Sequence, residues 1–285
     1  MVMNFIQGLI KYEFLQNALI TSVIVGLISG VIGSFIILRG MSLMGDAISH
    51  AVLPGVAVSY MLGANYIIGA SIFGLLAATL IGFVEQKSPL KSDTSIGIVF
   101  SSFFALGIVL ISRAQSSTDL NHILFGNVLA VRQSDIIMTA VVAVSVLIFI
   151  LLFYKELVVS SFDPTMAAAY GLNVKLIHYG LMFALTLVAV TSLQTIGTVL
   201  VVALLITPAA TGYLLTNKLT HMIIISSIIG VVSSVLGLFF SYTFNYPSGA
   251  TIVLTAACFF LLAFLFSPIK GLLFRNKGGV MNEEV

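Results

Sequence analysis

The sequence predicts an all-α membrane protein that crosses the bilayer many times, on the grounds of its composition and its long apolar runs. Of its 285 residues, 59% are hydrophobic and only 8% are charged, and the mean hydropathy is +1.17. A soluble domain carries about a quarter charged residues to cover its surface, so this chain must use lipid as its solvent. A spanning helix needs about 20 apolar residues. Nine runs meet this requirement, at about 14–38, 41–62, 66–84, 94–112, 135–153, 176–194, 196–215, 221–242 and 249–267.

The first run carries a pattern for close helix packing. Gly26 and Gly30, and likewise Ser29 and Gly33, are four residues apart. Small residues at this spacing let two helix backbones approach each other in lipid, where the hydrophobic effect does not drive helices together.

The second run holds Asp46 and His50, the only groups ionisable near neutral pH that lie well inside a predicted span. Charged groups within membrane spans are costly and mark functional sites. At a spacing of four residues, a carboxylate and an imidazole project from one helix face, where both can bind a divalent transition metal. An ion pair that only joins helices is the alternative. Pro54 lacks an N–H, so it should free a carbonyl near residue 50 and act as a hinge.

Two connections are longer than tight turns. Residues 113–134 contain the apolar stretch 120–130, which is too short to span and is read either as a half-helix or as an amphipathic surface helix. Residues 154–174 predict a short capped helix, with Asp163 as N-cap, Pro164 at the first helical position and Gly171 after its end. It is either a helical surface loop or a docking helix for a cytosolic protein.

The distribution of lysine and arginine predicts the N-terminus outside and the C-terminus in the cytoplasm. Alternating nine spans from an inner C-terminus leaves only Lys11, Arg113 and Arg132 outside. It places nine basic residues inside: Arg39, Lys87, Lys91, Lys155, Lys175, Lys218, Lys270, Arg275 and Lys277. No basic cluster or aromatic platform for nucleic acid is present.

Three stretches together give the chain a recognisable pattern. They are the Gly-Asp-Ala-Ile-Ser-His-Ala-Val-Leu-Pro-Gly run from Gly45, the Phe-Asp-Pro loop from Phe162 to Asn173, and the segment from Gly197 to Thr211. Over about 14–268 the chain resembles the membrane permease subunit of manganese/zinc/iron ATP-binding-cassette (ABC) importers, especially the manganese branch of Gram-positive bacteria. The resemblance implies one permease domain over 1–285, with a homodimeric fold like that of vitamin B12 importers. It also implies a bacterial cell-membrane location, a cytosolic ABC ATPase dimer and an extracellular metal-binding lipoprotein as partners.

The resemblance also implies residue roles. Asp46 and His50 match the metal-coordinating pair. Six residues of the loop at about 162–173 match a helix that couples the permease to its ATPase: Phe162, Asp163, Pro164, Ala168, Tyr170 and Gly171. Four more are expected near the pore: Ser49, Pro54, Thr207 and Pro208.

One chain offers two side-chain ligands, whereas such ions take about four to six. A two-fold axis beside the second span would bring two copies of each residue together around one dication. We expect a transport subunit with no catalytic residues and no permanently bound cofactor. The resemblance to the manganese branch implies Mn(II) as its cargo. Zn(II) and Fe(II) remain alternatives, as does an ion-coupled secondary carrier. The sequence contains neither a G-x-x-x-x-G-K-[ST] motif for ATP hydrolysis nor an H-E-x-x-H metalloprotease motif.

Overall fold

The computed structural model describes residues 2–113 and 128–273, and these residues form helices and connections without any strand. Eight of the helices are long and apolar enough to cross a membrane. They are α2 (Glu13–Leu38), α5 (Tyr66–Lys87), α6 (Ser92–Arg113), α8 (Gln133–Leu152), α11 (Val174–Ile196), α12 (Thr198–Leu215), α13 (Leu219–Phe244) and α14 (Ser248–Phe266). The shorter helices are α1 (Val2–Lys11), α3 (Met44–Ala51), α4 (Leu53–Leu62), α9 (Tyr154–Phe162), α10 (Pro164–Ala169) and the 3-10 turn η1 (Val128–Ala130).

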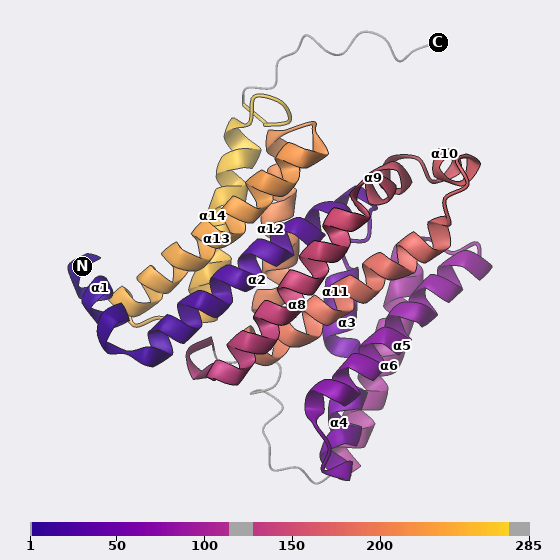
Figure 1. Cartoon of the computed structure of the whole chain (residues 1–285). Helices are drawn as coiled ribbons and strands as arrows, with labels where there is room; N and C mark the ends of the chain where they lie inside the picture. The colour runs from indigo at the N-terminus through magenta and orange to yellow at the C-terminus, as the bar shows by residue number, and fades with distance from the viewer. Residues whose placement is uncertain (1, 114–127, 274–285) are drawn as a thin grey trace.

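Helix α2 lies at the centre of the bundle. It packs against α12 and α13 on one side and against α8 on another, while α4, α5 and α6 form a separate group beyond α11 (Figure 1). Within their apolar stretches, 72% of the residues of α2 are buried, against 22% in α6, α8 and α14. Helix α2 is thus the most buried of the eight spanning helices, whereas α6, α8 and α14 leave much of their apolar surface for lipid.

The second predicted span is not one continuous helix. Residues 41–62 form α3 and α4, which are separated at Val52. Pro54 sits in the first turn of α4 and has no N–H for the carbonyl of His50 four residues earlier, so the ladder of backbone hydrogen bonds is interrupted there. The helix is broken where Pro54 predicts it, and a role of this break as a hinge stays a prediction. The uniform apolar composition of the stretch did not indicate that neither half reaches spanning length.

The predicted packing of small residues is confirmed along α2. A β-carbon placed on Gly26 would lie 2.6 Å from the carbonyl oxygen of Gly230, and one on Gly30 would lie 2.6 Å from the backbone nitrogen of Ser227. Gly33 meets the carbonyl of Leu205 on α12 in the same way. At these glycines, backbone therefore touches backbone and a larger side chain would not fit.

Replacing Gly26 by valine is expected to destabilise the protein, since overpacking costs about 1–3 kcal/mol. Each kcal/mol lowers the midpoint of thermal unfolding by roughly 2–4 °C in a chain of comparable size. The measurement is the unfolding midpoint of the purified protein in detergent. Gly97→Val is the matched control, because nothing lies within 4 Å of a β-carbon placed there. Equal midpoints for the two variants would contradict the close packing of α2 against α13.

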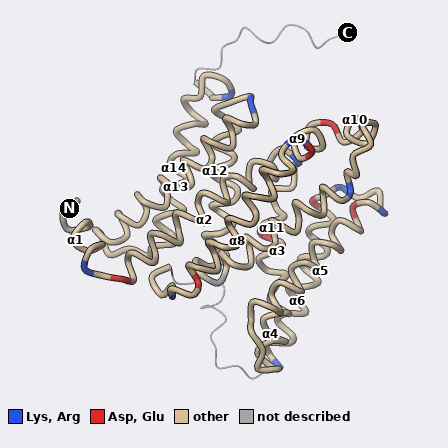
Figure 2. The backbone as a smooth tube through the Cα atoms, viewed as in Figure 1, with Lys and Arg blue, Asp and Glu red and all other residues tan. Residues whose placement is uncertain are grey.

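Charged residues gather toward the helix ends and the connections (Figure 2). This pattern agrees with a multi-pass membrane protein, while the orientation of its termini stays a prediction. Of the long connection 113–134, residues 114–127 lie outside the described residues, so the choice between a half-helix and a surface helix stays open.

Candidate metal site

Asp46 and His50 lie on one face of α3, as their spacing predicts. The His50 Nε2 atom is 3.5 Å from the Asp46 Oδ1 atom, and the two side chains are 22% and 43% exposed, respectively. A well-formed N–H···O bond measures about 2.9–3.0 Å, so the two groups face each other only loosely. Both therefore keep lone pairs for a third atom placed between them.

Two aromatic rings from α6 enclose the imidazole of His50. The ring centroid of Phe104 lies 5.4 Å away at an interplanar angle of 81°, and that of Phe100 lies 5.6 Å away at 63°. Such edge-to-face contacts fix the orientation of the ring. Sequence patterns gave no indication of these contacts, because they depend on how α6 packs against α3.

The Nδ1 atom of His50 is buried and has no hydrogen-bond partner among the described residues. A buried polar atom without a partner costs about 1–3 kcal/mol, so unpaired atoms in native structures call for an explanation. The nitrogen that faces the Asp46 carboxylate is the other one, Nε2, and an imidazole nitrogen beside a carboxylate oxygen has the chemistry of a site for a borderline divalent cation.

Side chains of the described residues alone do not complete such a site. Among the described residues, no group of three or more His, Cys, Asp or Glu side chains converges. The interruption before Pro54 adds a backbone oxygen, the carbonyl of His50, as a potential ligand. Ser49 is buried and its hydroxyl donates a 2.8 Å hydrogen bond to the carbonyl of Gly45, so it satisfies its own helix.

The other residues expected near the pore lie on α12. Pro208 is buried inside that helix and Thr207 is half-buried. Helix α12 contacts α3, where a β-carbon on Gly45 would lie 3.0 Å from the Cδ1 atom of Leu205. The structure thus places this segment beside α3, the helix that carries Asp46 and His50, and its role at the pore remains a prediction.

The capped helix predicted in the 154–174 connection is confirmed as α10. The Asp163 carboxylate accepts hydrogen bonds from the Thr165 hydroxyl and the backbone N–H of Met166. These two bonds lower the pKa of Asp163 below its usual value, which favours the ionised form that caps the helix. Gly171 has φ of +79°, and hydrogen bonds from Gly171 to Ala168 and from Leu172 to Ala167 close the C-terminus as a Schellman motif.

Helix α10 and the residues that flank it expose apolar side chains at the surface. Phe162, Met166 and Tyr170 are 61%, 48% and 69% exposed, whereas Ala167 is fully buried. Pro164, Ala168 and Gly171 are exposed as well. The preceding helix α9 was not predicted, because the sequence analysis assigned no helix to the residues between 154 and Phe162.

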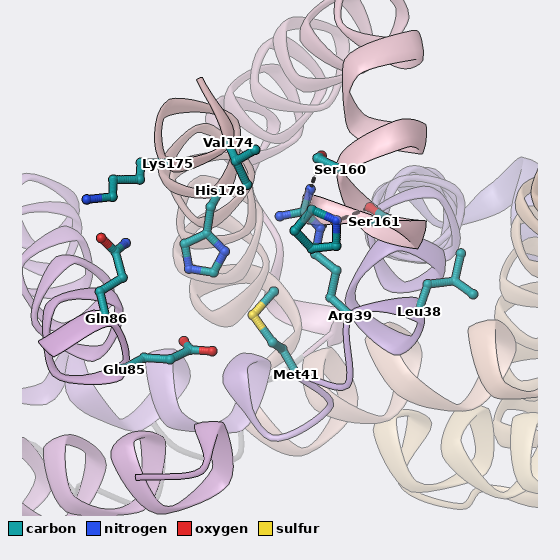
Figure 3. A pocket seen from close by; sticks show the side chains of 11 residues that line it. Leu38, Arg39, Met41, Glu85, Gln86, Ser160, Ser161, Val174, Lys175 and His178 are labelled. Atoms are coloured by element: carbon teal, nitrogen blue, oxygen red, sulfur yellow. Dashed lines mark hydrogen bonds between the residues drawn. The ribbon is translucent and has the colours of Figure 1, made fainter. Parts of the chain in front are cut away.

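A cavity of about 490 Å³ opens beside α10 (Figure 3). Arg39 enters it from the end of α2, Glu85 from α5, and Lys175 and His178 from α11. One carboxylate oxygen of Glu85 is buried without a partner among the described residues. From the sequence, Arg39 and Lys175 were predicted only to lie on the cytoplasmic side, and His178 only to lie near the end of a span. The cavity that they line was not predicted, because residues so far apart in the chain share no local pattern.

Comparisons with known proteins agree with this architecture. The model of the ABC 3 transport family matches residues 11–267. The chain is 67% identical over 279 residues to the manganese transport system membrane protein MntC of Listeria monocytogenes, covering 98% of this chain and all of that protein. It is 57% identical to the manganese import system permease protein ScaB of Streptococcus parasanguinis, covering 94% and 96% of the two chains. The solved structure of PsaBC from Streptococcus pneumoniae in complex with Fab superposes with a TM-score of 0.85 at 57% identity, covering 95% of this chain and 98% of that one.

Proposed function

Since the chain belongs to the ABC 3 transport family, we propose that it is the permease subunit of an ATP-driven importer that carries Mn(II) across the bacterial cell membrane. The observation that carries the choice of metal is the 67% identity, over nearly the whole chain, to a manganese transport membrane protein. The ligand chemistry is compatible, because a carboxylate and an imidazole without a thiolate suit manganese and disfavour copper(I).

We place the ion between Asp46 and His50. The loose contact between the Nε2 atom of His50 and the Asp46 carboxylate supports this assignment. Two ligands are too few for Mn(II), so the site is completed by the same pair from a second copy of the chain related by a two-fold axis. Two carboxylates then balance the charge of the dication, and in its absence they would repel each other.

Helix α10 is the proposed docking element for a cytosolic ABC ATPase pair. It is rigid, because both ends are capped by local hydrogen bonds. Met166 on this helix and its flanking residues Phe162 and Tyr170 are exposed, and aromatic side chains are typical anchors of protein interfaces. In this arrangement the C-terminus lies in the cytoplasm, and a metal-binding lipoprotein delivers the ion from outside.

The residues of this chain then have three tasks in transport. Asp46 and His50 replace part of the hydration shell of the ion, and the rings of Phe100 and Phe104 hold His50 in position. The interruption at Val52 allows α3 to move without displacing all of α4. ATP binding and hydrolysis on the partner supply the energy, through α10.

The test is uptake of radioactive manganese by vesicles that contain the chain with its partner ATPase and are supplied with the metal-binding lipoprotein. We expect uptake that requires ATP inside the compartment representing the cytosol and that excess unlabelled Mn(II) abolishes. Zn(II) or Fe(II) is expected to compete at much higher concentrations than Mn(II). Preferential uptake of Zn(II) or Fe(II) would overturn the choice of manganese, and uptake that continues without the ATPase would identify a secondary carrier.

A further inference from the structure

Arg39 joins two parts of the chain that are remote in sequence. It is the C-cap residue of α2, and its guanidinium donates two hydrogen bonds to serine hydroxyls in the last turn of α9. Nε is 3.0 Å from the Ser161 Oγ atom, and one terminal nitrogen is 2.7 Å from the Ser160 Oγ atom (Figure 3). Both serines lie more than 120 residues further along the chain.

The hydrogen bonds of this cluster are mutually consistent. Ser160 and Ser161 each donate to the carbonyl of Leu157, at 3.3 and 2.6 Å. Each hydroxyl hydrogen is therefore in use, and the oxygens are left to accept from Arg39. The planar guanidinium supplies two N–H groups in a fixed fork that suits two neighbouring acceptors.

Arg39 makes these bonds without a carboxylate partner. Among residues 2–113 and 128–273, no carboxylate lies within ion-pair distance of Arg39. Burial lowers the pKa of Arg39 relative to its usual value, but an arginine side chain keeps its charge in proteins. A half-buried cation held by two neutral hydroxyls is a poor choice for simple packing, since apolar side chains fill such a position at lower cost.

Short, hydrogen-bonded turns connect Arg39 to α3, which carries Asp46 and His50, and connect Ser161 to α10. On one side, Gly40 has φ of +68° and the N–H of Met41 bonds to the carbonyl of Ile36, which closes α2 as a Schellman motif. Met41 is buried, and α3 with Asp46 begins three residues later. On the other side, Ser161 is two residues from Asp163, the cap of α10.

We propose that Arg39 is a positioning residue that transmits movement of α10, through Ser160 and Ser161, to the metal-binding helix α3. The inference rests on the proposed function, because it assumes that an ATPase moves α10. When α10 and the end of α9 are displaced, the two hydrogen bonds pull the end of α2 with them, and the rigid turn at Gly40 passes the displacement to α3. Without the link, α10 can move while the metal site stays where it is.

The experiment compares variants of the assembled complex in vesicles, with manganese import and ATP hydrolysis measured in the same sample. The variants are Arg39→Met, Arg39→Lys and the double change Ser160→Ala with Ser161→Ala. Lys175→Met is the matched control, because it removes a cation that lines the same cavity. The readout is the number of ions imported per ATP hydrolysed, which a general loss of folded protein does not change.

For Arg39→Met we expect the ions imported per ATP to fall by about tenfold or more, since hydrogen bonds to a charged group are lost, with ATP hydrolysis maintained. The double serine variant is expected to show the same defect, Arg39→Lys a smaller one, and Lys175→Met none. If Arg39→Met does not fold, the double serine variant decides the question. An unchanged ratio in either assembled variant overturns the role of Arg39 while leaving the proposed function intact. Wild-type vesicles that import no metal would instead refute the proposed function, and the inference with it.

Discussion

Replacing Asp46 or His50 by alanine is expected to abolish manganese uptake while leaving the complex with its ATPase assembled. Loss of a residue that only supports a metal ligand typically costs 10–100-fold in metal affinity, so loss of a ligand itself should lower uptake by at least about 100-fold. In a two-fold site each substitution removes two ligands at once. Asp46→Asn retains the shape of the side chain and removes only its charge, and we expect it to be nearly as damaging.

Two substitutions serve as matched controls for this prediction. Asp93→Ala removes an exposed carboxylate from the first turn of α6, and His221→Ala removes an exposed imidazole near the start of α13. Both should leave uptake close to that of the wild type. Normal transport by an assembled Asp46→Ala or His50→Ala complex would exclude these residues from the ion path. Uptake lost in proportion to the amount of assembled complex would point to a structural ion pair instead.

Local sequence patterns predicted the features of this fold that depend on neighbouring residues. The pairing of Asp46 with His50 follows from the helical repeat, and the cap, proline and glycine of α10 are each chosen by the backbone geometry at their own position. The eight long helices follow from apolar length alone. In each case the feature is determined by a few residues that are close together in the sequence.

Features that depend on packing between distant segments could not be read from the sequence. Neither the rings of Phe100 and Phe104 around His50 nor the hydrogen bonds of Arg39 to Ser160 and Ser161 leave a local pattern. The broken span at Val52 is an intermediate case. Pro54 predicted an interruption of the helix near this position, but the apolar residues on both sides are equally compatible with one long helix.

Tyr170→Asp is expected to separate the chain from its ATPase without changing the metal site. Tyr170 is 69% exposed and lies beside the exposed Met166 on the proposed docking helix. Truncating an interface anchor typically costs at least about 2 kcal/mol, and a carboxylate buried without a partner adds to this cost. We therefore expect the ATPase to bind at least about thirtyfold more weakly, measured by co-purification and by titration of the ATPase onto the permease.

The design must separate loss of docking from damage to α10 itself. An acidic side chain at the C-terminal end of a helix is unfavourable by a few tenths of a kcal/mol, so Tyr170→Ala is included because it removes the ring without adding charge. Tyr246→Asp is the matched control, since this tyrosine is 61% exposed on the connection between α13 and α14. No residue of α10 belongs to the proposed metal site at Asp46 and His50. The affinity of the isolated permease for manganese should therefore be the same in all three variants. Full co-purification of the ATPase with Tyr170→Asp would show that the partner docks elsewhere, and a fall in metal affinity would show that α10 and α3 are coupled even without the ATPase.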